Sequence, residues 1–303
     1  MSDNSKKGLL YMLGAAFCFS VSGACTKILG KRISSVELVF FRNIIGVLFV
    51  LFTIYRRPLV QVGGKMSLLI FRGVIGTLAL YTFFFSITKI GLAEAITYQQ
   101  SYPILLALLG GYFLKEKIDF KNWLAVIVGF IGICCIFLPQ FRIDITSIKY
   151  HTFGLANAIM TALAYMSIKQ LSGYYDARSI VLSFMFSGIV LPIISMILGQ
   201  YIYIDSLAFL FGSFNWPIGI EWLWIITLAL SALVGQILLT KAFTYGNTGE
   251  VSAIGYSNIV FSVIFGVLLG DSFPNALSLL GILLIITCGV YISFRKNEVK
   301  TAE

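Results

Sequence analysis

Ten long apolar segments constrain this sequence more than any other feature. They cover residues 8–29, 34–55, 66–88, 91–113, 122–139, 152–172, 179–202, 220–243, 248–270 and 275–294. A helix that crosses a bilayer needs about 20 predominantly apolar residues. Only 12% of the residues are charged, whereas soluble domains carry about 25%. We therefore predict an all-α membrane protein with ten transmembrane helices, surrounded by the lipid bilayer.

The basic residues in the loops predict the orientation. Ten spans place both termini on one side, and that side carries 14 of the Lys and Arg residues, against 5 on the opposite side. Basic residues in short loops stay in the cytoplasm. We expect a multi-pass protein of the cell (inner) membrane with both termini cytoplasmic. The net charge of +9 is spread over separate loops, which argues against a nucleic-acid partner.

The two halves of the chain contain matching residues. An offset of 142 aligns Lys27 with Lys169, and an offset of 156 aligns Glu94 with Glu250 and Ser101 with Ser257. We predict one five-helix repeat in residues 1–140 and a second in residues 150–297. Because five is odd, the second repeat enters the membrane from the other side. Inverted repeats are typical of secondary transporters, whose substrate sites lie near the midplane.

Several segments also resemble a known family. They are "GAAFCFSVSGACTK", "ELVFFRNIIG", "LAEAITYQQSYPILLALLGGYFLKEK", "GQILLTKAFTYG" and "SAIGYSNIVFSVIFG". They resemble the drug/metabolite transporter superfamily of EamA type, over essentially the whole chain. The resemblance implies two EamA repeats and transport of amino acids or nucleoside-like metabolites such as S-adenosylmethionine. Ile259 stands where Pro103 maps, so we expect the two halves to be mechanically inequivalent.

Two arginines lie inside predicted spans. Charges there are costly and usually face a cavity or a partner. Arg42 lies eight residues into its segment. It is either an anion-binding or gating charge in the central cavity, or a structural residue that forms an ion pair or binds backbone carbonyl groups. Arg72 is six residues into the next segment, and we expect its long side chain to reach the interface.

The fourth segment is unusually polar for a span. At 100° per residue, Glu94, Tyr98 and Ser101 share one helix face, with Tyr102 at its edge and Gln99 on the far side. Pro103 removes a backbone hydrogen bond, so we expect a kink there that helps gating. We interpret this stretch as a cavity wall; the alternative is that its aromatic and amide side chains only pack between helices.

Further candidates lie in the second half. Gln236, Thr240 and Tyr256 are neutral hydrogen-bonding residues for a substrate. Lys169, Lys241 and Glu250 are candidates for gating, with interfacial anchoring as the alternative for the lysines and helix-dipole stabilisation for Glu250. We expect Glu94 to couple protons to substrate movement, and Glu250 to do so less, because burial raises the proton affinity of a carboxylate.

The sequence contains none of the usual catalytic motifs. It has no zinc-protease, phosphate-loop or serine-elbow pattern, and its five cysteines lack metal-ligand spacing. We expect His151, the single histidine, to be a surface residue. We therefore predict a protein that is not an enzyme and has no metal and no cofactor.

The combined prediction is a secondary active transporter. It exports or exchanges a small polar or amphipathic metabolite by alternating access. The alternatives are a flippase for a lipid-linked substrate and a non-transporting membrane sensor or scaffold. A GxxxG pair at Gly266 and Gly270 leaves both a monomer and a homodimer open.

Overall fold

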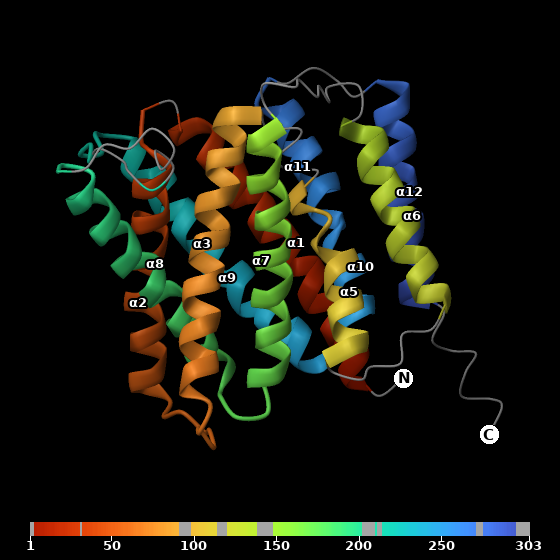
Figure 1. The fold of residues 1–303 in the computed structure, drawn as a ribbon, viewed down its shortest axis with the longest axis horizontal. Helices are drawn as coiled ribbons and strands as arrows, with labels where there is room; N and C mark the ends of the chain where they lie inside the picture. The colour runs from red at the N-terminus through yellow and green to blue at the C-terminus, as the bar shows by residue number, and fades with distance from the viewer. Residues whose placement is uncertain are drawn as a thin grey trace.

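The fold is a bundle of helices that run side by side between two ends (Figure 1). The computed structural model describes residues 3–30, 32–90, 98–113, 120–137, 148–201, 210, 214–270 and 275–294, and contains no strand in these ranges. The first-half helices are α1 (Asp3–Leu29), α2 (Ser35–Arg56), α3 (Met66–Ile90), α5 (Tyr102–Phe113) and α6 (Phe120–Phe137). The second-half helices are α7 (Ile148–Leu171), α8 (Ala177–Leu198), α9 (Glu221–Tyr245), α10 (Thr248–Gly255), α11 (Ser257–Leu268) and α12 (Ala276–Phe294).

Six stretches of the described helices are long and apolar enough to cross a membrane. They are Lys6–Leu29, Val36–Arg56, Met66–Phe83, Ala177–Leu198, Glu221–Tyr245 and Thr248–Leu268, the last made of α10 and α11 together. Large apolar side chains such as Leu48, Phe52 and Leu283 are exposed on the outside of the bundle. A lipid environment accommodates such a surface, whereas water does not. The prediction of an all-α, multi-pass membrane protein is therefore confirmed.

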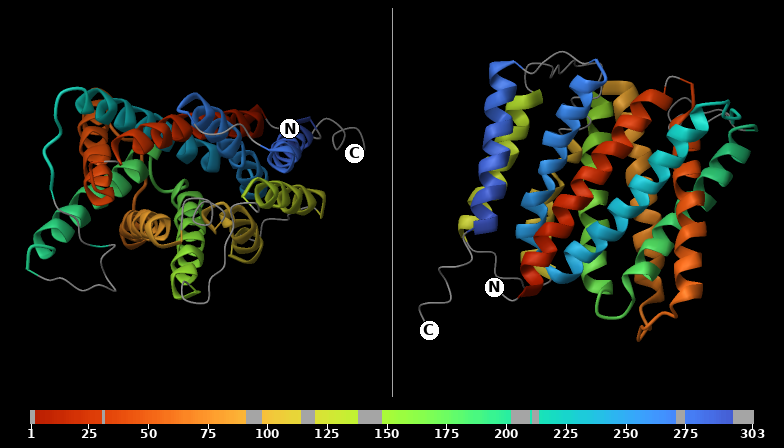
Figure 2. Two further views of the ribbon diagram at one scale, coloured as in Figure 1. Left: turned by 90° about the horizontal axis from the view of Figure 1, so that it is seen from above. Right: turned by 180° about the vertical axis from the view of Figure 1, so that it is seen from behind.

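The two five-helix units are inverted relative to each other. α1 begins and α12 ends at the same end of the bundle, which we call the terminal end; α1 runs away from it and α7 runs towards it (Figure 1). α1 packs along α9, and in the same way α7 packs along α3; α2 packs against α8, and α6 against α12 (Figure 2). Exchanging the two units maps this set of helix pairs onto itself, as an inverted repeat requires.

The fourth span of each unit is interrupted at matching positions. Tyr98 and Gln99 are helical, a turn follows, and α5 begins at Tyr102. In the second half, Tyr256 separates α10 from α11. At each interruption a serine hydroxyl donates to the carbonyl three residues earlier: Ser101 Oγ to Tyr98 O at 2.6 Å, and Ser257 Oγ to Ile254 O at 2.7 Å.

The first interruption lies next to Pro103. It covers residues 100–101, in the turn before Pro103, which lies buried in the first turn of α5. Pro103 has no N–H to donate to the carbonyl of Gln99, so the interruption lies where a break caused by the proline is expected. Ile259, the counterpart of Pro103, occupies the first turn of α11, and this span is interrupted at Tyr256 without a proline. The mechanical inequivalence of the two halves stays a prediction.

α2 and α8 approach closely at Gly188. The Asn43 side-chain amide donates to Val39 O at 2.7 Å and to Gly188 O at 3.4 Å. A Cβ atom at residue 188 would overlap that amide group. The buried Asn43 side chain is held by these two bonds, so it has little freedom to move aside.

Gly188→Ala is therefore expected to lower the free energy of unfolding by about 1–3 kcal/mol, the usual effect of overpacking a tight contact. Gly23→Ala is the matched control, because a Cβ there meets nothing within 4 Å. The control variant should unfold at or above the wild-type temperature, since alanine favours a helix interior. Thermal unfolding in detergent measures both; equal unfolding temperatures for the two variants would contradict the packing argument.

Arg178 holds the connection between α2 and α3 at the terminal end. Its Nη1 donates to Thr53 O at 3.1 Å and to Arg57 O at 2.7 Å. Its Nη2 donates to Asp176 Oδ2 at 2.8 Å, and Asp176 also caps α8 by accepting from the Arg178 backbone N–H. The hydrogen bond from the Arg178 side chain is the main cause that lowers the pKa of the Asp176 carboxyl.

Asp176→Asn is expected to lower the stability of the protein by less than about 1 kcal/mol near neutral pH, because the ion pair is partly exposed. Asparagine caps helices as well as aspartate does, so the variant removes only the charge. A carboxyl with a lowered folded-state pKa stabilises above its ordinary value of 3.8 and loses this effect as the pH falls through the lowered pKa. Unfolding temperatures of wild type and variant should converge in acid; a constant difference would refute this linkage.

Candidate substrate-binding site

Two arginine side chains from different helices meet at one phenylalanine ring. The Arg72 guanidinium carbon lies 4.6 Å from the ring centroid of Phe184, and the Arg42 guanidinium carbon lies 5.7 Å from it. Arg42 comes from α2, Arg72 from α3 and Phe184 from α8. The first two helices run in opposite directions (Figure 1), so the arginines enter from opposite ends and converge inside the bundle.

The Arg72 side chain is deeply buried. It is 1% exposed and ranks among the largest fully buried side chains. Gly76 makes room for it, because a Cβ there would overlap Arg72 Nη1 and would lie 2.9 Å from the Phe184 ring. The expectation that Arg72 reaches the membrane interface is therefore wrong: its guanidinium turns inward onto the Phe184 ring.

Three nitrogen atoms of this arginine pair are buried and make no hydrogen bond within the described residues: Arg72 Nε, Arg72 Nη1 and Arg42 Nε. In the part of the chain that the structure describes, the ion pairs join Arg32 to Glu221 and Arg178 to Asp176, and none involves the buried pair. The Tyr165 hydroxyl, on α7, is close enough to interact electrostatically with both guanidinium groups.

The Phe184 ring does not compensate for burying two charges. A cation–π contact contributes about 0.5–2 kcal/mol, and here two cations share one ring. Insertion scales give about 2.5–3.5 kcal/mol for each arginine at the centre of a span. The like charges also repel each other. The arrangement therefore costs stability, as is typical of a functional site rather than of a structural one.

The residues predicted from the fourth span divide between two places. Tyr102 is buried, and its ring packs edge-on against Tyr165 at 5.0 Å, which places it next to the arginine pair. Tyr98 lies further from the terminal end, where its hydroxyl is 3.2 Å from His151 Nδ1. Gln99 is half-buried, and Ser101 bonds to its own helix. Glu94 lies outside the described residues.

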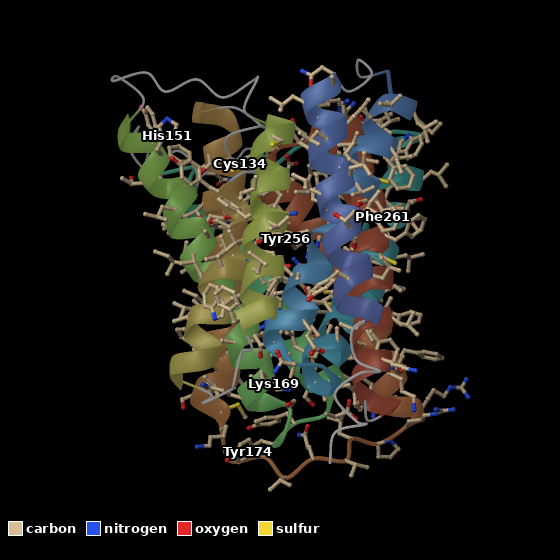
Figure 3. All side chains as sticks on the ribbon, turned by 90° about the vertical axis from the view of Figure 1, so that its right-hand side faces the viewer. Cys134, His151, Lys169, Tyr174, Tyr256 and Phe261 are labelled. Carbon is tan, nitrogen blue, oxygen red and sulfur yellow. The ribbon has the colours of Figure 1, made fainter. Side chains whose placement is uncertain are left out.

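His151 also corrects an expectation. It is 7% exposed and lies at the end of the bundle away from the termini (Figure 3). Its ring stacks at a tilt on Tyr98, with 5.7 Å between ring centroids. The His151 side chain, in the first turn of α7, therefore points into the bundle. The expectation that it is a surface residue is wrong.

The candidates of the second half are buried and hydrogen-bonded within the protein, except for one atom. Tyr256 lies midway between the ends of the bundle (Figure 3), and its hydroxyl donates to Val126 O at 3.3 Å. Thr240 Oγ1 donates to Gln236 O at 2.8 Å. Gln236 is 3% exposed, and its Nε2 has no hydrogen-bond partner. Contact of these three residues with substrate stays a prediction.

Residues of α1, α7 and α9 contact one another at the terminal end; we call this cluster the terminal-end seal. It consists of Gly8, Tyr11, Lys169, Lys241, Tyr245 and Gly246. Lys169 Nζ donates to Gly246 O at 2.8 Å, and a Cβ at Gly8 would lie 2.8 Å from Gly246 Cα. The Tyr11 and Tyr245 rings are 6.0 Å apart, and Lys241 Nζ lies 5.6 Å from the Tyr11 ring centroid.

Glu250 lies next to this seal, in the first turn of α10, whose N-cap is Asn247. A carboxylate there interacts favourably with the helix dipole, the alternative that the sequence left open for it. Among the described residues no group of three His, Cys, Asp or Glu side chains is placed to hold a metal ion.

Reasoning from sequence missed Phe184 and Tyr165. Both stand in apolar runs, where an aromatic residue normally indicates packing, so no pattern singled them out. The signal that was present is the pair of charges inside predicted spans, since a buried arginine must have neighbours that tolerate it.

Comparison with known proteins identifies the class. The EamA-like transporter family matches residues 6–138 and again 148–295. An uncharacterized transporter of Helicobacter pylori (strain ATCC 700392 / 26695) is 33% identical over 94% of both chains. The pseudopaline exporter CntI of Pseudomonas aeruginosa is 28% identical, with 97% of this chain and 99% of the exporter covered. The S-adenosylmethionine uptake transporter of Rickettsia felis is 22% identical, with 96% and 94% covered.

The protein belongs to the EamA-like transporter family, as the sequence resemblance implied. A crystal structure at 15% identity superposes with a TM-score of 0.81 over 97% of this chain and 99% of the other, which supports the same fold. The family and the named relatives are transporters, not enzymes. The protein is thus a membrane-embedded transporter of small metabolites.

Proposed function

We propose that the protein is a secondary active transporter that exports or exchanges a small polar metabolite by alternating access. The matched interruptions at Ser101 and Ser257 carry this proposal. Interrupted helices at corresponding places of inverted repeats are the usual surroundings of a transported substrate. The buried arginine pair lies beside this region, because Tyr102 at the start of α5 packs on Tyr165.

The repeat also suggests what changes between the two states. In the state described here, Lys169 at the end of α7 bonds to Gly246 at the end of α9. In the first repeat, α1 corresponds to α7 and α3 corresponds to α9, so Lys27 corresponds to Lys169. In the other state, we propose, Lys27 moves onto the end of α3 while Lys169 releases Gly246.

A disulfide across the terminal-end seal tests alternating access. Tyr11→Cys and Tyr245→Cys are introduced after replacing the five native cysteines, and the transported metabolite is identified by comparing the medium of expressing and control cells. Oxidation should stop transport and a reductant should restore it, while each single cysteine variant stays active. Unchanged transport by the cross-linked protein, or no metabolite that differs in the medium, would overturn the proposal.

The orientation and the metabolite are part of the same proposal. We place the terminal end in the cytoplasm of a bacterial inner membrane, because the basic residues lie mainly on that side. One relative is named for export of pseudopaline and another for uptake of S-adenosylmethionine, so proteins of this similarity move metabolites in either direction. An amino acid or a nucleoside-like compound is the class we propose.

Proton coupling through Glu94 belongs to this proposal as well. A carboxylate in a span holds its proton more tightly when its site closes, and binding then differs between the two states. Glu94→Gln should bind substrate yet lose accumulation driven by a pH gradient in proteoliposomes. Flux with an unchanged pH dependence would remove Glu94 from the coupling mechanism.

A further inference from the structure

Among the described residues, no negative group compensates the positive charge of the arginine pair inside the bundle. Both guanidinium groups contact the aromatic ring of Phe184. The neighbouring groups named above, the hydroxyl of Tyr165 and the ring of Tyr102, are neutral. None of the described ion pairs involves Arg42 or Arg72. Two positive charges held this close are most stable when a group with negative charge lies between them or beside them.

The unpartnered donors specify the chemistry of that group. Arg72 offers Nε and Nη1, and Arg42 offers Nε, all buried and without a hydrogen-bond partner. Oxygens of a carboxylate or a phosphate are the strongest acceptors for such charged donors. Nε and Nη1 of Arg72 donate from different edges of the guanidinium, so they bind separate oxygen atoms, and Arg42 adds a third donor from the adjacent helix.

We propose that Arg42 and Arg72 together bind a doubly negative group of the transported metabolite, either two carboxylates or one phosphate. This inference rests on the proposed function, because the site must open to solvent during the transport cycle. It narrows the substrate class to anionic metabolites and excludes net cations, which the pair repels. Arg72 supplies two donors, Nε and Nη1, and Arg42 supplies a third donor and the second charge.

Thermal unfolding of the purified full-length protein tests this without any transport measurement. Sodium succinate and sodium phosphate are the two probes, sodium chloride at equal ionic strength is the reference, and succinamide is the neutral analogue of succinate. A ligand that binds only the folded protein raises its unfolding temperature. Wild type should be stabilised by succinate, by phosphate or by both, and not by succinamide; which dianion acts distinguishes a dicarboxylate from a phosphate group.

Three variants make the result specific. Arg72→Met and Arg42→Met should lose the response, with the apparent affinity for the active dianion at least about 30-fold weaker. Arg56→Met is the matched control, because Arg56 also stacks on a phenylalanine, Phe52 at 5.2 Å, but on the exposed surface; its response should equal that of wild type. In chloride, Arg72→Met should unfold at or above the wild-type temperature, since an uncompensated charge is gone.

A wild-type protein that responds to neither dianion would overturn the inference. So would an Arg72→Met variant that responds as strongly as wild type. If Arg72→Met does not purify, Arg42→Met and the wild-type response still decide. If the dianions raise the unfolding temperature but the cross-link across the terminal-end seal does not stop transport, alternating access is refuted and the anion site is not. The two proposals can therefore fail separately.

Discussion

Arg72→Met is expected to abolish most transport while the protein still inserts and folds. Removing one partner of a buried charged contact costs about 2–5 kcal/mol of binding, so flux at a subsaturating substrate concentration should fall about 30-fold or more. Arg72 is fully buried with two unpartnered nitrogens, so methionine removes donors that the protein itself does not use. Uptake or efflux of the transported metabolite in proteoliposomes measures the effect.

Arg56→Met again provides the control, since it removes an equal charge from the exposed surface at the end of α2. It should transport as wild type does. The sequence alone ranked Arg42 above Arg72, because Arg42 lies deeper in its segment. The structure reverses that order: Arg72 is 1% exposed, whereas Arg42 is half-buried as a residue and buries its Nε atom. Full transport by Arg72→Met at matched expression would refute its role and leave Arg42 as the sole candidate.

The architecture of this protein was predictable because its physical causes are local. Apolar length determines where a helix can cross the membrane, and the paired offsets of 142 and 156 identify the repeats. The predicted segment 34–55 lies within one residue, at either end, of α2 (Ser35–Arg56). The predicted segment 179–202 lies within four residues, at either end, of α8 (Ala177–Leu198). Helix ends vary by a few residues under any criterion.

The proline rule accounts for only one of the two helix interruptions. Pro103 lacks a backbone donor, and the break at residues 100–101 lies in the turn before it. The break at Tyr256 occurs without any proline. The shared features are the serines, Ser101 and Ser257, whose hydroxyls bond to a carbonyl three residues back. The serine hydroxyl often makes this hydrogen bond within continuous helices, so a serine alone does not predict a helix interruption.

The arginine site was only half predictable, for a different reason. A charge inside a span indicates a functional position whatever the fold, and this identified Arg42. Whether Arg72 points to the interface or inward depends on its neighbours in other helices, namely Phe184 on α8 and the space left by Gly76 on α3. Depth along one segment does not contain that information. His151 was misjudged in the same way, because its partner Tyr98 comes from a distant part of the chain.

Lys169→Met is expected to open the terminal end of the bundle. Lys169 Nζ donates to Gly246 O at 2.8 Å, and a hydrogen bond with a charged donor contributes about 1.5–3 kcal/mol. If this bond exists only while the end is closed, its loss shifts the equilibrium between the two states by about tenfold or more. Methionine keeps much of the length of the side chain and removes the donor, so the change in packing is small.

A buried reporter next to the seal measures this shift. Thr248 is fully buried at the start of α10, so Thr248→Cys, in a background without the five native cysteines, should react slowly with a maleimide. Adding Lys169→Met should raise the labelling rate about tenfold or more, because the cysteine is reached only when the seal opens. Lys65→Met is the control: Lys65 lies at the same end and contacts an aromatic ring, Tyr174 at 5.3 Å, but on the exposed surface. Equal labelling rates with and without Lys169→Met would mean that Lys169 anchors the end of α7 and does not gate the transporter.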